Sequence, residues 1–277
     1  MQKKHETIKT RIWFEEPESD NPYAANACYC SGYDVYGELL GNISWIQYLY
    51  LLFKLELPTP QQAQLLENLA VALANPGIRD HSVRAAMNAG VGGSTRASAL
   101  MAALAVGAGN LGGGREVFQA MGLWKDLGKD IEPWRAVLGD VDHHESVDVW
   151  VPMEHFPGFD PNGNTCPKPI IQALELLAEN SPGKSLKWLL ENRAMLESEI
   201  GYPLAMSGVA AAALADVELS PEQGEMLYLM LRLPGAAAHA LEQENHGWRQ
   251  YPFFGSSIKP MSDEDYQSLL RSLGEEQ

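Results

Sequence analysis

Hydrophobic positions recur at helical spacing along most of this chain. The run ISWIQYLYLLFKLEL at 43–57 predicts a strongly apolar helix, and Ser44 stands where its N-cap is expected. A second helix is expected to follow, because Thr59 can cap it, Pro60 suits a first helical position and Gln62 completes a capping box. Both helix starts are therefore predicted from local side-chain chemistry.

The rest of the chain repeats this pattern with two interruptions. Small residues dominate 83–106, where two helices separated by NAGVGGST are expected, either in a buried core or at a subunit interface. Residues 122–169 include Pro152, Pro157, Pro161 and Pro167 and predict a long loop, of the kind that is more often functional than idle. Further helices are expected at 169–179, 184–199, 203–216 and 221–243, with a short last helix opened by Ser262 and Asp265.

These patterns predict an all-α fold of about nine or ten helices. Only residues 1–42, rich in Tyr, Asn and Gly, lack helical periodicity, and short strands or irregular structure are expected there. Hydrophobic residues make up 45% of the 277 positions, enough for a sizeable core. With 36 acidic against 20 basic residues the formal net charge is −16, which disfavours nucleic acid and anionic membranes as partners.

The apolar runs and the cysteines indicate the cellular compartment in which the protein is expected. The charged opening shows no apolar signal-peptide core, and the apolar run at 97–108 is too short to cross a membrane. An odd number of cysteines, Cys28, Cys30 and Cys166, fits reduced thiols, so a cytoplasmic protein is expected. Cys28 and Cys30 have no second pair to complete a zinc site, and no metal is expected.

One acidic segment leaves two interpretations open. The sequence DVDHHESVD at 140–148 carries two histidines and four carboxylates. Such a set can ligate a metal or supply an acid–base pair. The alternative is a solvated acidic loop, which we prefer for so polar a stretch.

Four segments in order resemble the citrate synthase superfamily, and in particular its short citryl-CoA lyase-like branch. They are SGYDVYGELLGNISW, the AGNLGGGREV loop at 108–117, PGFDPNGNTCPKP and MLRLPGAAAHALEQ, and the resemblance covers about residues 29–260. It implies an all-α fold with a large domain at 1–120 and 200–277 and a small domain at 121–199. It also implies a homodimer with its active site near the interface, a coenzyme A thioester as substrate or ligand, and chemistry at a carbon–carbon bond.

The resemblance places unsuitable residues at the family's three proton-handling positions. The histidine of the family's glycine loop falls on Gly112, the histidine of its PGF segment on Pro161 and its general-base aspartate on Ser207. Glycine and proline cannot transfer a proton, and a serine hydroxyl is far too weak a base near neutral pH. Gly112 and Gly113 still resemble the part of the loop that lets coenzyme A approach the backbone.

Several residues match ligand-facing positions of the family. His81 matches a substrate-side histidine. Arg232 and Arg249 match arginines that bind the carboxylate of the acid substrate and reach across the dimer, respectively, and guanidinium groups suit carboxylates well. Helix packing is an equally good interpretation of Arg232 and the preferred one of His239.

The altered loops offer further candidates. Asp160 lies beside the position of the lost histidine and is a candidate base, with a solvated loop carboxylate as the alternative. Asn162 replaces a family arginine on the substrate side. Lys168 is a candidate contact for a coenzyme A phosphate, with a simple exposed lysine as the alternative.

Two functions from different classes remain open. The first is an acyl-CoA carbon–carbon lyase or acyltransferase in which Asp160 and His81 are relocated catalytic groups. The second is a non-catalytic pseudoenzyme or scaffold subunit, favoured by the simultaneous loss of three groups that act as a unit. A third arrangement pairs the chain with an active paralogue in a heteromer, to whose site Arg249 contributes.

Overall fold

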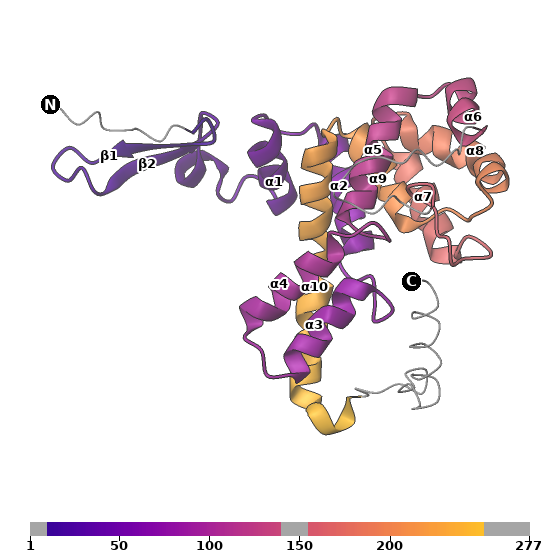
Figure 1. The fold of residues 1–277 in the computed structure, drawn as a ribbon. Helices are drawn as coiled ribbons and strands as arrows, with labels where there is room; N and C mark the ends of the chain where they lie inside the picture. Colours follow the sequence, from indigo (N-terminus) through magenta and orange to yellow (C-terminus); the bar gives the residue numbers. More distant parts are fainter. Residues whose placement is uncertain (1–9, 140–154, 252–277) are drawn as a thin grey trace, which may run out of the picture.

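The computed structural model describes residues 10–139 and 155–251 of the chain. It consists of a helical body, a helical arm and a small sheet that projects from the body next to α1 (Figure 1). The long helix α10 runs through both the body and the arm. The α-helices of the described residues are α1 (Trp45–Lys54), α2 (Pro60–Leu73), α3 (His81–Val91), α4 (Arg96–Gly107), α5 (Gly114–Leu127), α6 (Ile131–Gly139), α7 (Lys168–Asn180), α8 (Ser185–Ile200), α9 (Met206–Asp216) and α10 (Pro221–His246).

Three helices begin at capping boxes, where the sequence predicted an N-cap at Ser44 and a capping box at Thr59. Ser44, Thr59 and Ser220 each accept a hydrogen bond from the backbone N–H three residues later, and the glutamine at that later position bonds back to the backbone of the capping residue. Each box satisfies two donors that the first helical turn would otherwise leave unpaired. The predicted starts of α1, α2 and α10 are confirmed.

The N-terminal region forms the only sheet among the described residues. Strands β1 (Trp13–Pro17), β2 (Ala25–Cys30) and β3 (Tyr33–Asp34) pair antiparallel in that order, followed by a π-helical turn at Val35–Leu39. A small core of Cys30, Leu39 and Leu51 joins this region to α1. The fold is therefore mostly helical, and the short strands expected within 1–42 are present.

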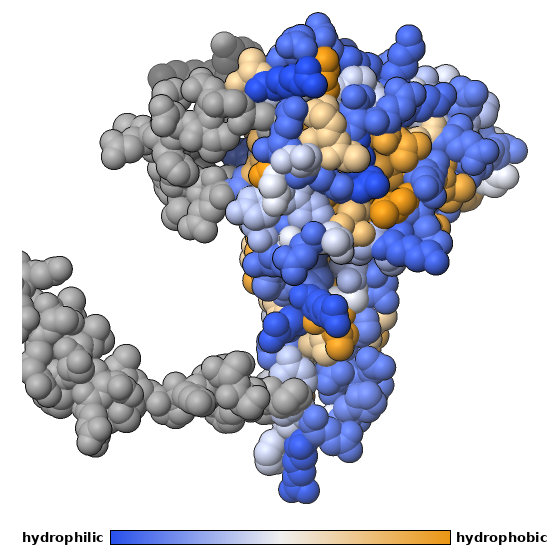
Figure 2. Space-filling view, turned by 90° about the vertical axis from the view of Figure 1, so that its right-hand side faces the viewer, coloured by the Kyte–Doolittle hydropathy of each residue, from blue (hydrophilic) through white to orange (hydrophobic). Residues whose placement is uncertain are grey.

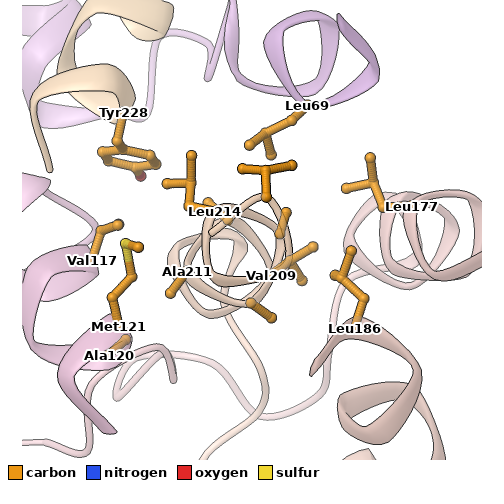
Figure 3. Packing of buried hydrophobic residues seen from close by; sticks show 14 of the residues in the cluster. Leu69, Val117, Ala120, Met121, Leu177, Leu186, Val209, Ala211, Leu214 and Tyr228 are labelled. Atoms are coloured by element: carbon orange, nitrogen blue, oxygen red, sulfur yellow. The ribbon is translucent and has the colours of Figure 1, made fainter. Parts of the chain in front are cut away.

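Helix α9 is the centre of the main hydrophobic core. Its sequence MSGVAAAALAD is buried at nearly every position. Because most of its side chains are small, α2, α5, α7, α8 and α10 can pack around it closely, and Figure 3 shows their side chains arranged around α9 viewed along its axis. This core contains residues from both of the expected domains, 1–120 with 200–277 and 121–199. The division of the chain into these two domains stays a prediction.

The arm is a separate packing unit of α3, α4 and the second half of α10. Its own core is made mostly of alanines, with Val83 and Met87. Gly90 of α3 lies against the backbone of Ala240 in α10, so closely that a side chain at 90 would collide with the Ala240 carbonyl. The two small-residue helices expected within 83–106 are thus α3 and α4, broken at 92–95.

The prediction of a loop over 122–169 is wrong for its first part. Helix α5 continues to Leu127, and α6 follows directly. Pro133 lies in the first turn of α6, where a missing N–H costs nothing. The helix is held by Trp134, whose ring centroid lies 4.9 Å from that of Trp124 and 5.3 Å from that of Trp188. The 140–148 segment and the last helix expected at Ser262 lie outside the described residues.

The face in Figure 2 is largely hydrophilic, with hydrophobic side chains exposed in patches over the body and in a smaller group on the arm. Among the described residues, no helix combines the length and hydropathy needed to cross a bilayer.

Candidate functional site

Three segments meet at the buried carboxylate of Glu116, in the first turn of α5. The Glu116 residue is only 1% exposed. Its oxygens accept hydrogen bonds from the backbone N–H of Gly112, from the backbone N–H of Gly158 at 2.8 Å and from the hydroxyl of Ser207 at 2.8 Å. The glycine loop, the PGF segment and the start of α9 are therefore tied together by one side chain.

The glycine loop favours glycine at 112 by its backbone conformation and at 113 by close packing. Gly112 has φ +65°, a left-handed conformation that favours glycine. Gly113 is the N-cap of α5, and a Cβ there would collide with the carbonyl oxygens of Gly109 and Gly107. Glycine at 112 and 113 is thus explained by the backbone of the loop itself, and neither residue offers a group for chemistry. The approach of a ligand to this backbone stays a prediction.

The carbonyl of Gly112 is held from the opposite side by α10. It accepts a hydrogen bond from the Tyr228 hydroxyl at 2.8 Å and another from Arg232 Nη1 at 2.9 Å. The other end of the Arg232 guanidinium pairs with Asp80, the N-cap of α3. Burial raises the pKa of Tyr228 to about 12, although nearby Arg232 opposes the shift. The phenol is therefore protonated at neutral pH and can act as a donor.

This shift predicts a loss of stability at alkaline pH. A folded-state pKa of about 12, against 10.0 for the unstructured side chain, means that stability is full below pH 10 and is lost as the pH rises toward 12. We expect Tyr228 to account for about 1 kcal/mol of the decrease in unfolding free energy by pH 11. Urea titrations at pH 8 and pH 11 should show a smaller decrease for Tyr228→Phe than for wild type. Tyr23→Phe, at a side chain that is 98% exposed, is the control and should behave as wild type.

The PGF segment packs directly on α9. Gly158 has φ +91°, and a Cβ there would lie 2.8 Å from the Cα of Gly208. Its carbonyl accepts from the N–H of Ala205 at 2.9 Å, and the N–H of Asp160 donates to the Pro203 carbonyl at 2.8 Å. Glycine at both 158 and 208 allows the loop to lie against the start of α9, next to Ser207.

His155 is a second buried polar residue at this junction. Its side chain is 5% exposed, and Nε2 lies 3.7 Å from Oε1 of Glu116, too far for a direct hydrogen bond. Nε2 has no hydrogen-bond partner. The sequence analysis missed both Glu116 and His155. For Glu116 a signal was present, an acid at the third position of a helix that starts at a glycine turn, whereas nothing local marks His155 as buried.

The two proposed catalytic groups, Asp160 and His81, lie on different elements. The Asp160 carboxylate accepts the backbone N–H of Asn162 at 2.9 Å, so it stabilises a turn of its own loop. His81 is the exposed first residue of α3. No contact between them occurs in the part of the chain that the structure describes, and their catalytic roles stay predictions.

The proposed ligand-binding residues differ in their burial and in their contacts with other side chains of the chain. Arg232 is buried, with its guanidinium engaged by Asp80 and Gly112. Asn162 and Lys168 are exposed, and so is Arg249, which stacks over Trp248 at 5.4 Å. Their roles in binding stay predictions. The preferred interpretation of His239 as a packing residue is consistent with its contacts to Glu242 and Asn75.

No cluster of three or more metal-ligating side chains occurs among residues 10–139 and 155–251. The acidic segment at 140–148 lies outside these ranges.

Comparison of the chain with known proteins gives its fold. No protein-family model matches it, and no curated protein matches it by sequence. Solved structures do match: the chain has the mostly helical fold shared by citryl-CoA lyases, ATP citrate lyases and citrate synthases. The fold implied by the sequence motifs is confirmed.

Three of these structures illustrate the match. Citryl-CoA lyase from Hydrogenobacter thermophilus is 20% identical with a TM-score of 0.64, and the match covers 94% of this chain and 99% of the lyase. ATP citrate lyase from Methanothrix soehngenii, in complex with citrate and coenzyme A, is 17% identical with a TM-score of 0.69 over 94% of this chain, which spans only 43% of that protein. Citrate synthase from Thermoplasma acidophilum, with carboxymethyl coenzyme A and oxaloacetate, is 15% identical with a TM-score of 0.56, over 79% of this chain and 58% of the synthase.

Proposed function

We propose that this chain binds a coenzyme A thioester together with a carboxylic acid, where the glycine loop, the PGF segment and the start of α9 meet. The Glu116 junction carries the proposal, because one buried carboxylate fixes these three segments relative to one another. The ligands are proposed from two structures with this fold, one holding citrate and coenzyme A and the other carboxymethyl coenzyme A and oxaloacetate. The thioester is proposed as a substrate or ligand of this site, approached by the backbone of Gly112 and Gly113 and by the exposed amine of Lys168.

If the chain is an enzyme, its reaction does not use the groups at 112, 161 and 207. Proton transfer next to a thioester needs a base, and an oxyanion needs a donor. Asp160 and His81 remain the proposed catalytic groups from the sequence, while His155 is the histidine that lies at the junction itself. We propose acyl-CoA carbon–carbon lyase or acyltransferase chemistry on these residues.

The second candidate is a protein that binds these ligands without turning them over. It is supported by the internal contacts of the charged groups. Glu116 accepts three hydrogen bonds, Asp160 stabilises its own turn and Arg232 is paired with Asp80. A charge engaged in this way must exchange its partner before it can act on a substrate.

A ligand titration tests the binding proposal, and an assay then separates the two candidates. At about 100 times its Kd a ligand stabilises the native state by about 2.7 kcal/mol, so a binding coenzyme A ester should raise the thermal midpoint clearly. No shift with any coenzyme A ester or small carboxylic acid would contradict the proposal. Mass spectrometry of the bound esters, together with an assay for released thiol, distinguishes enzyme from binder, because carbon–carbon cleavage changes the acyl group and leaves the thioester intact, whereas acyl transfer to water or to an acid frees the thiol. Loss of turnover in Asp160→Asn and His81→Ala, but not in the exposed control Glu175→Gln, supports catalysis by these groups.

We also propose that the chain assembles through its arm, as a homodimer or with a paralogue. Met101 and Val106 on α4 and Leu241 on α10 are exposed apolar side chains. An apolar groove between these helices is lined by Ala99, Leu100 and Leu241, among others. Such a surface on a three-helix arm with a thin core suits burial against a second copy. A molar mass by light scattering of twice 30.4 kDa would support the homodimer, and a mass of 30.4 kDa would contradict it.

A further inference from the structure

Three buried polar atoms without hydrogen-bond partners belong to residues in the first turns of α5 or beside Glu116 of that helix. Only four buried side-chain nitrogen or oxygen atoms of the described residues lack a hydrogen-bond partner. One, Ser31 Oγ, lies near the sheet, and the other three are Arg115 Nε, Gln119 Oε1 and His155 Nε2. Native structures satisfy nearly all buried polar groups, so three unpaired atoms at one place call for a physical reason.

The spacing of Arg115 and Gln119 along α5 and the contact distance of His155 make all three residues neighbours of Glu116. Arg115 and Gln119 are four residues apart on α5, and Gln119 is three residues after Glu116, so Gln119 is a surface neighbour of both, with Cβ atoms about 5–6 Å apart. His155 Nε2 lies 3.7 Å from the Glu116 carboxylate. The guanidinium carbon of Arg115 lies 4.7 Å from the centre of the Phe118 ring, a cation–π contact that fixes its position.

The unpaired atoms differ in chemistry, and this restricts what can pair with them. Arg115 Nε can only donate a hydrogen bond, Gln119 Oε1 can only accept one, and His155 Nε2 can do either, depending on its tautomer. A simple carboxylate without a donor would satisfy Arg115 but not the Gln119 oxygen. A ligand that satisfies both carries an acidic oxygen and, close to it, a hydroxyl or amide N–H.

The charge of Glu116 does not exclude an acidic ligand here. Its two oxygens already accept from Gly112, Gly158 and Ser207, and they lie at the N-terminal turn of a 14-residue helix, where the helix dipole offsets negative charge. Arg115 adds a positive charge that no carboxylate of the described residues pairs with.

We propose that Arg115, Gln119 and His155 form the acid-binding subsite of this protein, for a small carboxylic acid with a hydrogen-bond donor on the carbon next to its carboxylate. Arg115 Nε donates to the carboxylate, and Gln119 Oε1 accepts from the donor of the ligand. His155 Nε2 bonds a remaining oxygen of the acid. This subsite rests on the proposed function, because it is the place where the acid of that proposal would bind.

Malate and succinate are a suitable pair of test ligands, because they differ only in one hydroxyl group. We expect calorimetric titration of the full-length protein to show malate binding at least about tenfold more tightly than succinate, since a site that hydrogen-bonds a hydroxyl discriminates strongly against its loss. Gln119→Leu should reduce this preference to less than about threefold while leaving succinate binding unchanged. Arg115→Met should weaken both acids at least about tenfold, whereas Arg84→Met, at an exposed arginine of α3, should bind both as wild type does.

The thermal midpoint without ligand is a second readout. Because Gln119 Oε1 has no hydrogen-bond partner, Gln119→Leu should keep or raise the midpoint, whereas Arg115→Met also loses the cation–π contact with Phe118 and serves only in the binding measurement. The subsite would be overturned by a lower midpoint in Gln119→Leu or by wild-type protein that binds malate and succinate equally. It would also be overturned by variants that bind both acids like wild type, or by loss of a dimer in Arg115→Met. If wild type binds neither acids nor coenzyme A esters, the proposed function fails as well. If it binds acids independently of Arg115 and Gln119, only the subsite fails.

Discussion

Glu116→Ala is expected to lower the free energy of unfolding by roughly 3–5 kcal/mol. The substitution removes the acceptor of the Gly112 and Gly158 N–H groups and of the Ser207 hydroxyl, and it leaves all three inside the protein. It also opens a space beside the buried His155 side chain. Urea denaturation at pH 7, followed by circular dichroism, measures the change.

Two further variants make this result specific to the junction. Glu116→Gln keeps one acceptor oxygen but turns an NH₂ group toward at least one donor, so it should cost about 2 kcal/mol. Glu175→Gln, at an exposed site on α7, makes the same chemical change outside the core and should stay within about 0.5 kcal/mol of wild type. A Glu116→Ala protein within about 1 kcal/mol of wild type would show that this carboxylate does not hold the three segments together.

The parts of the fold that could be predicted from the sequence depend on local chemistry. Ser44, Thr59 and Ser220 marked helix starts because a capping box involves only residues three positions apart. Helix α6 could not be predicted in the same way. It is short and carries Pro133 in its first turn, and its packing depends on the contacts of Trp134 with Trp124 and Trp188, from two other helices.

The candidate site was predicted in outline only. Motif order indicated that the glycine loop, the PGF segment and α9 belong to one site, and the structure brings their backbones together at Glu116. Glu116 itself was missed, because its burial and three donors come from segments up to 91 residues away. Asp160 was proposed as a base, although the sequence Asp160-Pro161-Asn162-Gly163 is a turn signal in its own right, and the carboxylate does accept the Asn162 N–H.

Glu116 bears on the prediction that Ser207 stands where the family that the motifs resemble has a general-base aspartate. Here the Ser207 hydroxyl donates to Glu116 Oε1 at 2.8 Å, and both side chains are buried. A carboxylate at position 207 would therefore face a second carboxylate at hydrogen-bond distance, and two such groups cannot both be ionised in a buried site. A serine at 207 and a glutamate at 116 are mutually consistent, and an aspartate at 207 is not consistent with that glutamate.

Ser207→Asp should accordingly destabilise the protein by at least about 4 kcal/mol at pH 8, through repulsion from Glu116 and burial of an added charge. Ser207→Ala, which only removes one hydrogen bond, should cost about 1–2 kcal/mol. Combining Ser207→Asp with Glu116→Gln removes the like-charge pair, so the double variant should be more stable than Ser207→Asp alone, a non-additivity that a double-mutant cycle in urea measures directly. The deficit of Ser207→Asp should also shrink at pH 5, because the two carboxyls can then share a proton. If Ser207→Asp is as stable as Ser207→Ala at pH 8, the Glu116 carboxylate does not lie against position 207 in solution, and the junction that supports the proposed site does not exist in this form.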